Sequence, residues 1–112
     1  MSTGTDDSHR QRAETLRTAL AGNTGITEAT LRTAVATRAA GGPPIAEPYD
    51  DLARQIGDAS YRVTDAQVDA VRQETGSDKA AFEIVMSACI GAGLARWDTA
   101  TRAIAEATDA PA

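Results

Sequence analysis

The residues most able to do chemistry are a glutamate and an Arg-Trp pair on one apolar helical stripe. Glu83 follows Phe82 at the start of this stripe, and a carboxylate at the edge of an apolar face can acquire a raised pKa that suits proton transfer. Further along, Arg96 and Trp97 are neighbours, and a fixed cation beside a large aromatic ring can frame a pocket for an anionic ligand. With Tyr61, these are the candidate ligand-binding or interface residues, and the sequence identifies no catalytic residue.

Glu83, Arg96 and Trp97 also have a structural interpretation, which we favour. Most glutamates on helix surfaces are solvated, and Glu83 fits that pattern. Trp97 and Arg96 belong to the residue types that are typical of subunit interfaces, where the ring anchors the contact and the arginine stem covers apolar surface. Asp98 is expected to pair with Arg102, which follows four residues later on the same helix.

The chain has one cysteine and one histidine, too few for a dithiol redox centre or a histidine-rich metal site. Cys89 lies mid-helix on the apolar stripe without a neighbouring cation, so we expect a buried thiol that fills space rather than a nucleophile. His9 lies in the first turn of the first predicted helix, and we expect it to be solvated. Because one histidine and one distant cysteine do not complete a zinc site, we predict no metal and no cofactor.

Charge and composition exclude several kinds of partner. A formal net charge of −5 argues against nucleic acid, because phosphate binding needs clustered Lys and Arg. No apolar run approaches the roughly 18 residues of a membrane span. The lone cysteine suits a reducing compartment. We therefore expect a cytoplasmic protein that binds neither nucleic acid nor membrane.

Helix start and stop signals predict an all-α fold, a compact bundle of about five helices with a long C-terminal helix. Ser8, Thr27, Thr64 and Ser77 are the expected N-terminal caps, and Thr64 forms a capping box with Gln67. The predicted helices cover residues 8–21, 27–40, a segment from near 48 through 56, 64–75 and 78–107. Residues 1–7 are expected to be a flexible N-terminus, 8–107 a single helical domain and 108–112 a frayed tail.

The last predicted helix carries most of the large apolar side chains. Over residues 78–107 it would be about 45 Å long, so it must bend or reach a neighbouring subunit. Gly91 and Gly93 in its interior indicate close approach by another helix, or a kink. An alanine-rich core buries little area, which makes a homo-oligomer the expected assembly. The predicted core or interface residues are Leu52, Ile56, Val68, Val71, Phe82, Val85, Met86, Ile90, Leu94, Trp97 and Ile104.

Three segments of the second half resemble a known family. The stretches 61–68 (Tyr-Arg-Val-Thr-Asp-Ala-Gln-Val), 80–85 (Ala-Ala-Phe-Glu-Ile-Val) and 90–97 (Ile-Gly-Ala-Gly-Leu-Ala-Arg-Trp) are similar to the C-terminal helices of alkylhydroperoxidase D-like and carboxymuconolactone decarboxylase-like proteins. The resemblance implies a helical oligomer. Redox members use a Cys-x-x-Cys pair, which this sequence lacks, and His9 lies outside the matched region. No catalytic residue therefore carries over.

Two functional hypotheses follow. The first is a non-redox accessory or protein-interaction domain that keeps this helical scaffold, with a protein partner or a second copy of the chain. The alternative is a divergent, decarboxylase-like enzyme or binder of a small acidic molecule, which would use Glu83, Arg96 and Tyr61 around a pocket. Whether the protein is an enzyme at all is left open by the sequence.

Overall fold

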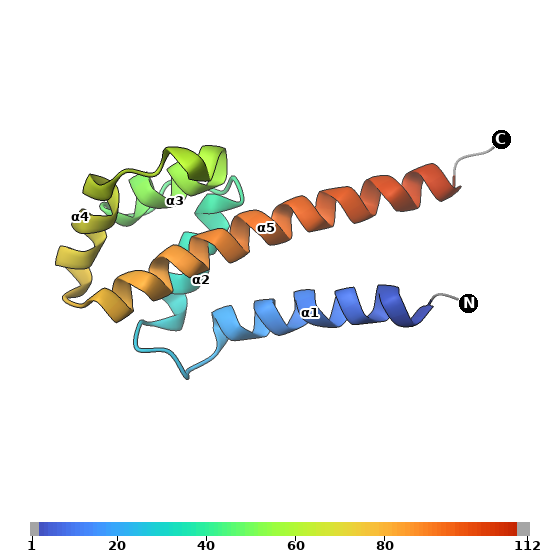
Figure 1. The fold of residues 1–112 in the computed structure, drawn as a ribbon, viewed down its shortest axis with the longest axis horizontal. Coiled ribbons are helices and arrows are strands. Elements are labelled where there is room, and N and C mark those ends of the chain that lie inside the picture. Colours follow the sequence, from blue (N-terminus) through green and yellow to red (C-terminus); the bar gives the residue numbers. More distant parts are fainter. Residues whose placement is uncertain (1–2, 110–112) are drawn as a thin grey trace.

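The computed structural model describes residues 3–109, with side chains from residue 7 onward. Over this range the fold is all-α, with five α-helices, one short 3-10 helix and no strand (Figure 1). This confirms the predicted fold class and the long C-terminal helix. The elements are α1 (Thr3–Ala21), α2 (Ala29–Ala39), α3 (Tyr49–Ala59), the 3-10 helix η1 (Ser60–Arg62), α4 (Asp65–Thr75) and α5 (Asp78–Asp109).

Local capping signals fix both ends of α4 and the start of α5. The predicted capping box is confirmed: the Thr64 hydroxyl accepts from the Gln67 amide at 3.2 Å, and the Gln67 side chain accepts from the Thr64 amide at 2.9 Å. Gly76 ends α4 in the left-handed conformation, with φ of 85°. The Ser77 hydroxyl then accepts from the Ala80 amide at 3.1 Å. This turn therefore sends the chain directly into α5.

Two other predicted capping residues are wrong. α1 begins at Thr3, so Ser8 lies inside the helix and does not cap it. Thr27 precedes α2, whose N-cap is Glu28. The Thr27 hydroxyl donates to Glu83 instead of capping the helix. At the other end, α5 runs unbroken through Gly91 and Gly93 to 109. Of the ends that were expected to be flexible or frayed, residues 3–7 belong to α1 and residues 108–109 to α5. Residues 1–2 and 110–112 lie outside the described residues.

The core lies where the first half of α5 packs against α2, α3 and α4. Its largest fully buried side chains are Leu52, Ile84, Val35 and Val71, and small residues surround them. A Cβ at Gly91 would collide with the backbone of Ala36, so this glycine allows α5 and α2 to approach closely. The close helix approach predicted for the glycine pair is thus confirmed at Gly91.

α1 and the second half of α5 form an elongated arm beside this core. The two helices run antiparallel, and the start of α1 lies at the same end of the molecule as the end of α5 (Figure 1). The arm gives the molecule principal extents of 54 × 27 × 21 Å. The Cα radius of gyration is 15.9 Å, whereas a compact chain of this length would have about 13 Å. The arm therefore exposes long stretches of helix surface.

Candidate functional site

α5 has apolar residues on two opposite faces. The inner face is made of Ile84 and small residues, and it packs into the core. The outer face carries larger side chains in steps of four and three residues, the spacing of a coiled-coil seam. We call this set the outer stripe: Phe82, Met86, Cys89, Gly93, Trp97, Ala100 and Ile104. All seven residues are exposed.

The exposure of the large members of the outer stripe sets it apart from the core. Phe82 is 63% exposed and Ile104 66%, while Met86 and Trp97 are 40% and 37% exposed. The prediction that these four residues belong to the chain's own core is therefore wrong. Their alternative assignment to a subunit interface stays a prediction. Contiguous apolar patches of this kind mark interaction surfaces in soluble proteins.

α1 borders the outer stripe and forms a groove with it. The groove has a volume of about 450 Å³. From α5 it is lined by Met86, Cys89, Ile90, Gly93, Leu94 and Trp97, and from α1 by His9, Arg12, Ala13 and Leu16. The imidazole of His9 lies against the indole of Trp97, with ring centroids 6.0 Å apart. His9 is exposed, as predicted.

One ion pair ties α1 to α5 alongside the groove. Arg17 donates to the carboxylate of Asp98 at 2.6 Å and to Glu14 at 2.8 Å. The hydrogen bond to Asp98 raises the pKa of the Arg17 guanidinium above its ordinary value. The expected pairing of Asp98 with Arg102 is therefore wrong, because the nearer cation comes from α1.

Cys89 is exposed on the outer stripe, so the prediction of a buried thiol is wrong within the single chain. The periodicity was correct in placing it among apolar residues, but this face of α5 lies outside the core. The imidazole of His9 lines the same groove as Cys89. Among the described residues, no group of three His, Cys, Asp or Glu side chains is placed to hold a metal ion.

Glu83 holds the loop between α1 and α2 rather than serving as a proton donor. Its carboxylate accepts from the Ile26 amide at 2.9 Å, the Thr27 amide at 3.0 Å and the Thr27 hydroxyl at 2.7 Å. These hydrogen bonds, with a smaller contribution from the charge of Arg32, lower its pKa to about 2. The hypothesis of a raised pKa is therefore wrong, because the carboxylate is held in its ionised form.

Arg32 completes this anchor from beneath the loop. Its side chain is buried, with 5% of the residue exposed, and it donates to the carbonyl oxygens of Leu20, Gly22 and Thr27. A buried guanidinium that binds three backbone carbonyls organises the turn that leads from α1 into α2. Sequence patterns give no signal for Arg32, because its partners lie in a loop without regular periodicity.

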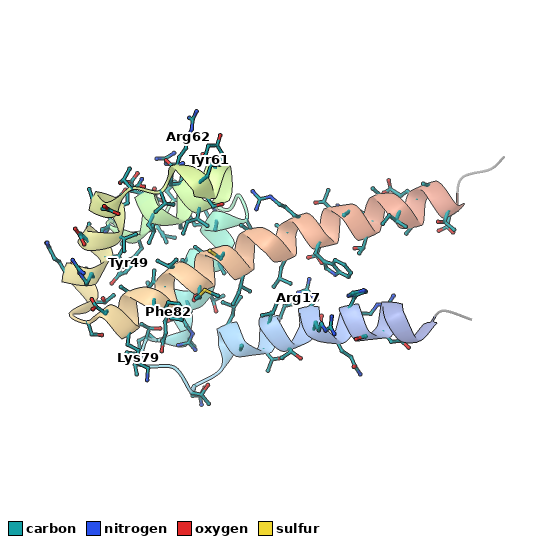
Figure 2. All side chains as sticks on the ribbon, in the orientation of Figure 1. Arg17, Tyr49, Tyr61, Arg62, Lys79 and Phe82 are labelled. Atoms are coloured by element: carbon teal, nitrogen blue, oxygen red, sulfur yellow. The ribbon has the colours of Figure 1, made fainter. Side chains whose placement is uncertain are left out.

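The remaining candidates lie elsewhere on the surface. Arg96 donates to the carbonyl oxygen of Gly57 on α3 at 2.8 Å. Tyr61 is 84% exposed on η1, where the guanidinium of Arg62 lies 5.8 Å from its ring centre. Figure 2 shows Tyr61 and Phe82 on opposite sides of α5 in that view. Glu83, Arg96 and Tyr61 therefore do not line a common pocket in the described structure.

α5 also has the length and composition of a membrane-crossing helix, so the expectation that no apolar segment approaches a membrane span is wrong. It contains an 18-residue window of mean hydropathy 1.3, of which 39% is buried inside the protein. A soluble core helix meets the same criteria, so the expectation that the protein does not bind a membrane stays a prediction. Comparisons with protein-family models, curated proteins and solved structures find no match to the chain.

Proposed function

We propose that this protein is a non-enzymatic interaction domain whose contact surface is the outer stripe of α5 together with the bordering face of α1. The observation that carries the proposal is that a seam of large apolar side chains runs along α5 on the side away from the core, with Phe82 63% exposed and Ile104 66% exposed. Such a surface has a favourable free energy of burial against another apolar helix.

The polar residues support an interaction role over acid-base chemistry. The Glu83 carboxylate accepts three hydrogen bonds from the loop between α1 and α2, and Arg96 contacts the backbone of α3. Both residues thus stabilise the scaffold on which the outer stripe is displayed. No particular observation favours the alternative, a binder of a small acidic molecule, over this role.

The resemblance to alkylhydroperoxidase D-like proteins agrees with an oligomeric helical scaffold, and it remains a prediction. A reducing cytoplasm is the compartment we propose, since an exposed lone thiol such as Cys89 would be prone to oxidation elsewhere.

Site-specific photo-crosslinking in the cells that make the protein tests this function. A benzophenone amino acid replaces Phe82 or Ile104 on the outer stripe, and Tyr61 on η1 serves as the exposed control. We expect covalent adducts from both stripe positions and none from the control. The adducts should disappear when Met86→Glu places a charge in the middle of the stripe, because burying an unpaired carboxylate is costly.

Crosslinks from Tyr61 alone, or none from the stripe, would refute the interaction role assigned to α5. The same would follow if Met86→Glu left the yield of stripe adducts unchanged while the chain stayed folded by circular dichroism. The mass of each adduct also identifies the partner, since a second copy of this chain adds 11.6 kDa.

A further inference from the structure

The outer stripe is symmetric about Gly93. Phe82 and Ile104 each lie eleven residues from it, Met86 and Ala100 seven, and Cys89 and Trp97 four. At 3.6 residues per turn these offsets are close to three, two and one turns, so all six residues share a face with Gly93. A stripe with this symmetry matches itself when a second α5 is laid against it in the opposite direction.

The packing of the described residues does not require a glycine at position 93. Among the described residues, nothing lies within 4 Å of a Cβ built at this position, and the residue is exposed. Glycine is nevertheless disfavoured in the interior of a helix, where alanine would be better. Gly91, only two residues away, differs because α2 packs directly against it. The backbone at Gly93 is thus free for close approach by a helix from outside the chain.

We infer that a second copy of this chain occupies the outer stripe, with the two α5 helices packed antiparallel about a two-fold axis at Gly93. This inference rests on the proposed interaction function and names its partner. The antiparallel register places Trp97 of one copy opposite Cys89 of the other, and Met86 opposite Ala100. Trp97 and Met86 therefore each meet a smaller residue, as in a well-packed core, while Phe82 faces Ile104. A parallel register would place each residue against itself, with two Trp97 rings in contact and a gap at Gly93.

The exposed area fits a homodimer. If a fully exposed large side chain carries roughly 200 Å², the exposed fractions of Phe82, Met86, Trp97 and Ile104 give about 400 Å² per chain. Two copies would bury about 800 Å² from these residues alone. Cys89, Ala100 and the flanking Leu16, itself 40% exposed, bring the total toward the roughly 1,000 Å² that a specific interface requires.

The arm has the right shape for this assembly. α1 and α5 are antiparallel neighbours joined by the Arg17–Asp98 ion pair. Two such helix pairs that meet along α5 form a four-helix bundle, with an α1 on each flank. A two-fold interface of this kind uses the same residues on both copies, which the symmetry of the stripe allows without any other partner.

Sedimentation velocity on the purified full chain tests the inference. From nanomolar to hundreds of micromolar concentration, the wild type should shift from the 11.6 kDa monomer to twice that mass. Gly93→Leu should weaken dimerisation about tenfold or more, because the two α5 backbones can no longer approach. The same variant should melt at a higher temperature than the wild type when both are monomeric, because leucine favours helix. Tyr61→Ser, on η1, should leave the dimer unchanged.

A charge exchange tests the antiparallel register. Phe82→Lys and Ile104→Glu should each weaken the dimer, and the double variant should recover it in part, because each lysine then faces a glutamate of the other copy. Both positions are exposed in the single chain, and circular dichroism confirms folding. The inference would be overturned by a wild type that stays monomeric, by a dimer whose Kd is unchanged in Gly93→Leu, or by a double variant that dimerises more weakly than both single variants. A chain that binds phosphatidylglycerol vesicles through this stripe instead of dimerising would also overturn it. A monomer that still gives stripe crosslinks to another protein in cells would leave the interaction function standing.

Discussion

Gly91 and Gly93 lie two residues apart on α5 and face opposite sides of the helix. The first packs against Ala36 of α2, and the second faces solvent in the single chain. The two glycines therefore report on the two faces of α5 separately, one on the core and one on the outer stripe.

Alanine at these two positions should have opposite effects on the isolated monomer. Gly91→Ala should lower the free energy of unfolding by about 1–3 kcal/mol, because the new methyl group forces α2 and α5 apart. Gly93→Ala should raise it by roughly 0.5–1 kcal/mol, since the methyl group is unobstructed and the helix gains propensity. Urea unfolding at nanomolar concentration, followed by Trp97 fluorescence, measures both values. Equal effects of the two variants would contradict the assignment of the faces.

Glu83→Gln should destabilise the protein, and the loss should depend on pH. The folded-state pKa of Glu83 is lowered to about 2 from 4.5, so its ionised form contributes stability above about pH 5, which is lost as the pH falls toward 2. Because the side chain is partly exposed, we discount the shift and expect about 1–2 kcal/mol at neutral pH. The difference between wild type and variant should shrink steadily between about pH 5 and pH 2.

Thermal unfolding over this pH range measures the effect, with Glu106→Gln on the exposed end of α5 as the matched control. The control should change stability by less than about 0.5 kcal/mol. A Glu83→Gln penalty that is the same at neutral and acid pH would show that the lost interaction does not require the ionised carboxylate.

Arg32→Met should loosen the loop between α1 and α2. The variant removes the donor for the carbonyl oxygens of Leu20, Gly22 and Thr27, and we expect a loss of about 2 kcal/mol. Arg32→Lys keeps the charge but not the planar guanidinium, so the stability of this variant should lie between those of the wild type and Arg32→Met. Hydrogen exchange should accelerate first at residues 22–28. Unchanged exchange there would contradict the anchoring role of Arg32.

The Arg17–Asp98 pair should contribute little to overall stability but should restrain α1. Both side chains are partly exposed, so a double-mutant cycle with alanine should give a coupling of about 0.2–1 kcal/mol that falls in high salt. Amide exchange in α1 should rise in either single variant. A coupling that survives molar salt would indicate a buried pair, contrary to the observed exposure.

The elements with local signals could be predicted from the sequence. Thr64 and Gln67 satisfy each other's backbone amides within a single turn, and Gly76 ends the same helix. Such signals need no information from the rest of the chain. Thr27 fails as a cap because its hydroxyl is taken by Glu83, 56 residues away, and short-range patterns do not report a contact at that separation.

The candidate site was also predictable only in part, because its exposure and its charges depend on contacts between distant parts of the chain. Helical periodicity correctly groups Phe82, Met86 and Trp97 on one face, but periodicity does not tell whether the same chain covers that face. The pKa of Glu83 likewise depends on amides of a distant loop. Sequence patterns therefore located the apolar stripe and missed both its exposure and the loop anchor.

The reaction of native Cys89 with a thiol reagent tests the central claim most directly, because this thiol lies on the outer stripe opposite the predicted position of Trp97 from the second copy. We predict rapid labelling at nanomolar concentration, where the thiol is exposed in the monomer. We also predict progressive protection as the concentration rises, with a midpoint that matches the dimer Kd from sedimentation. Gly93→Leu should abolish the protection. A labelling rate that is independent of concentration in the wild type would contradict the packing of two α5 helices along this stripe.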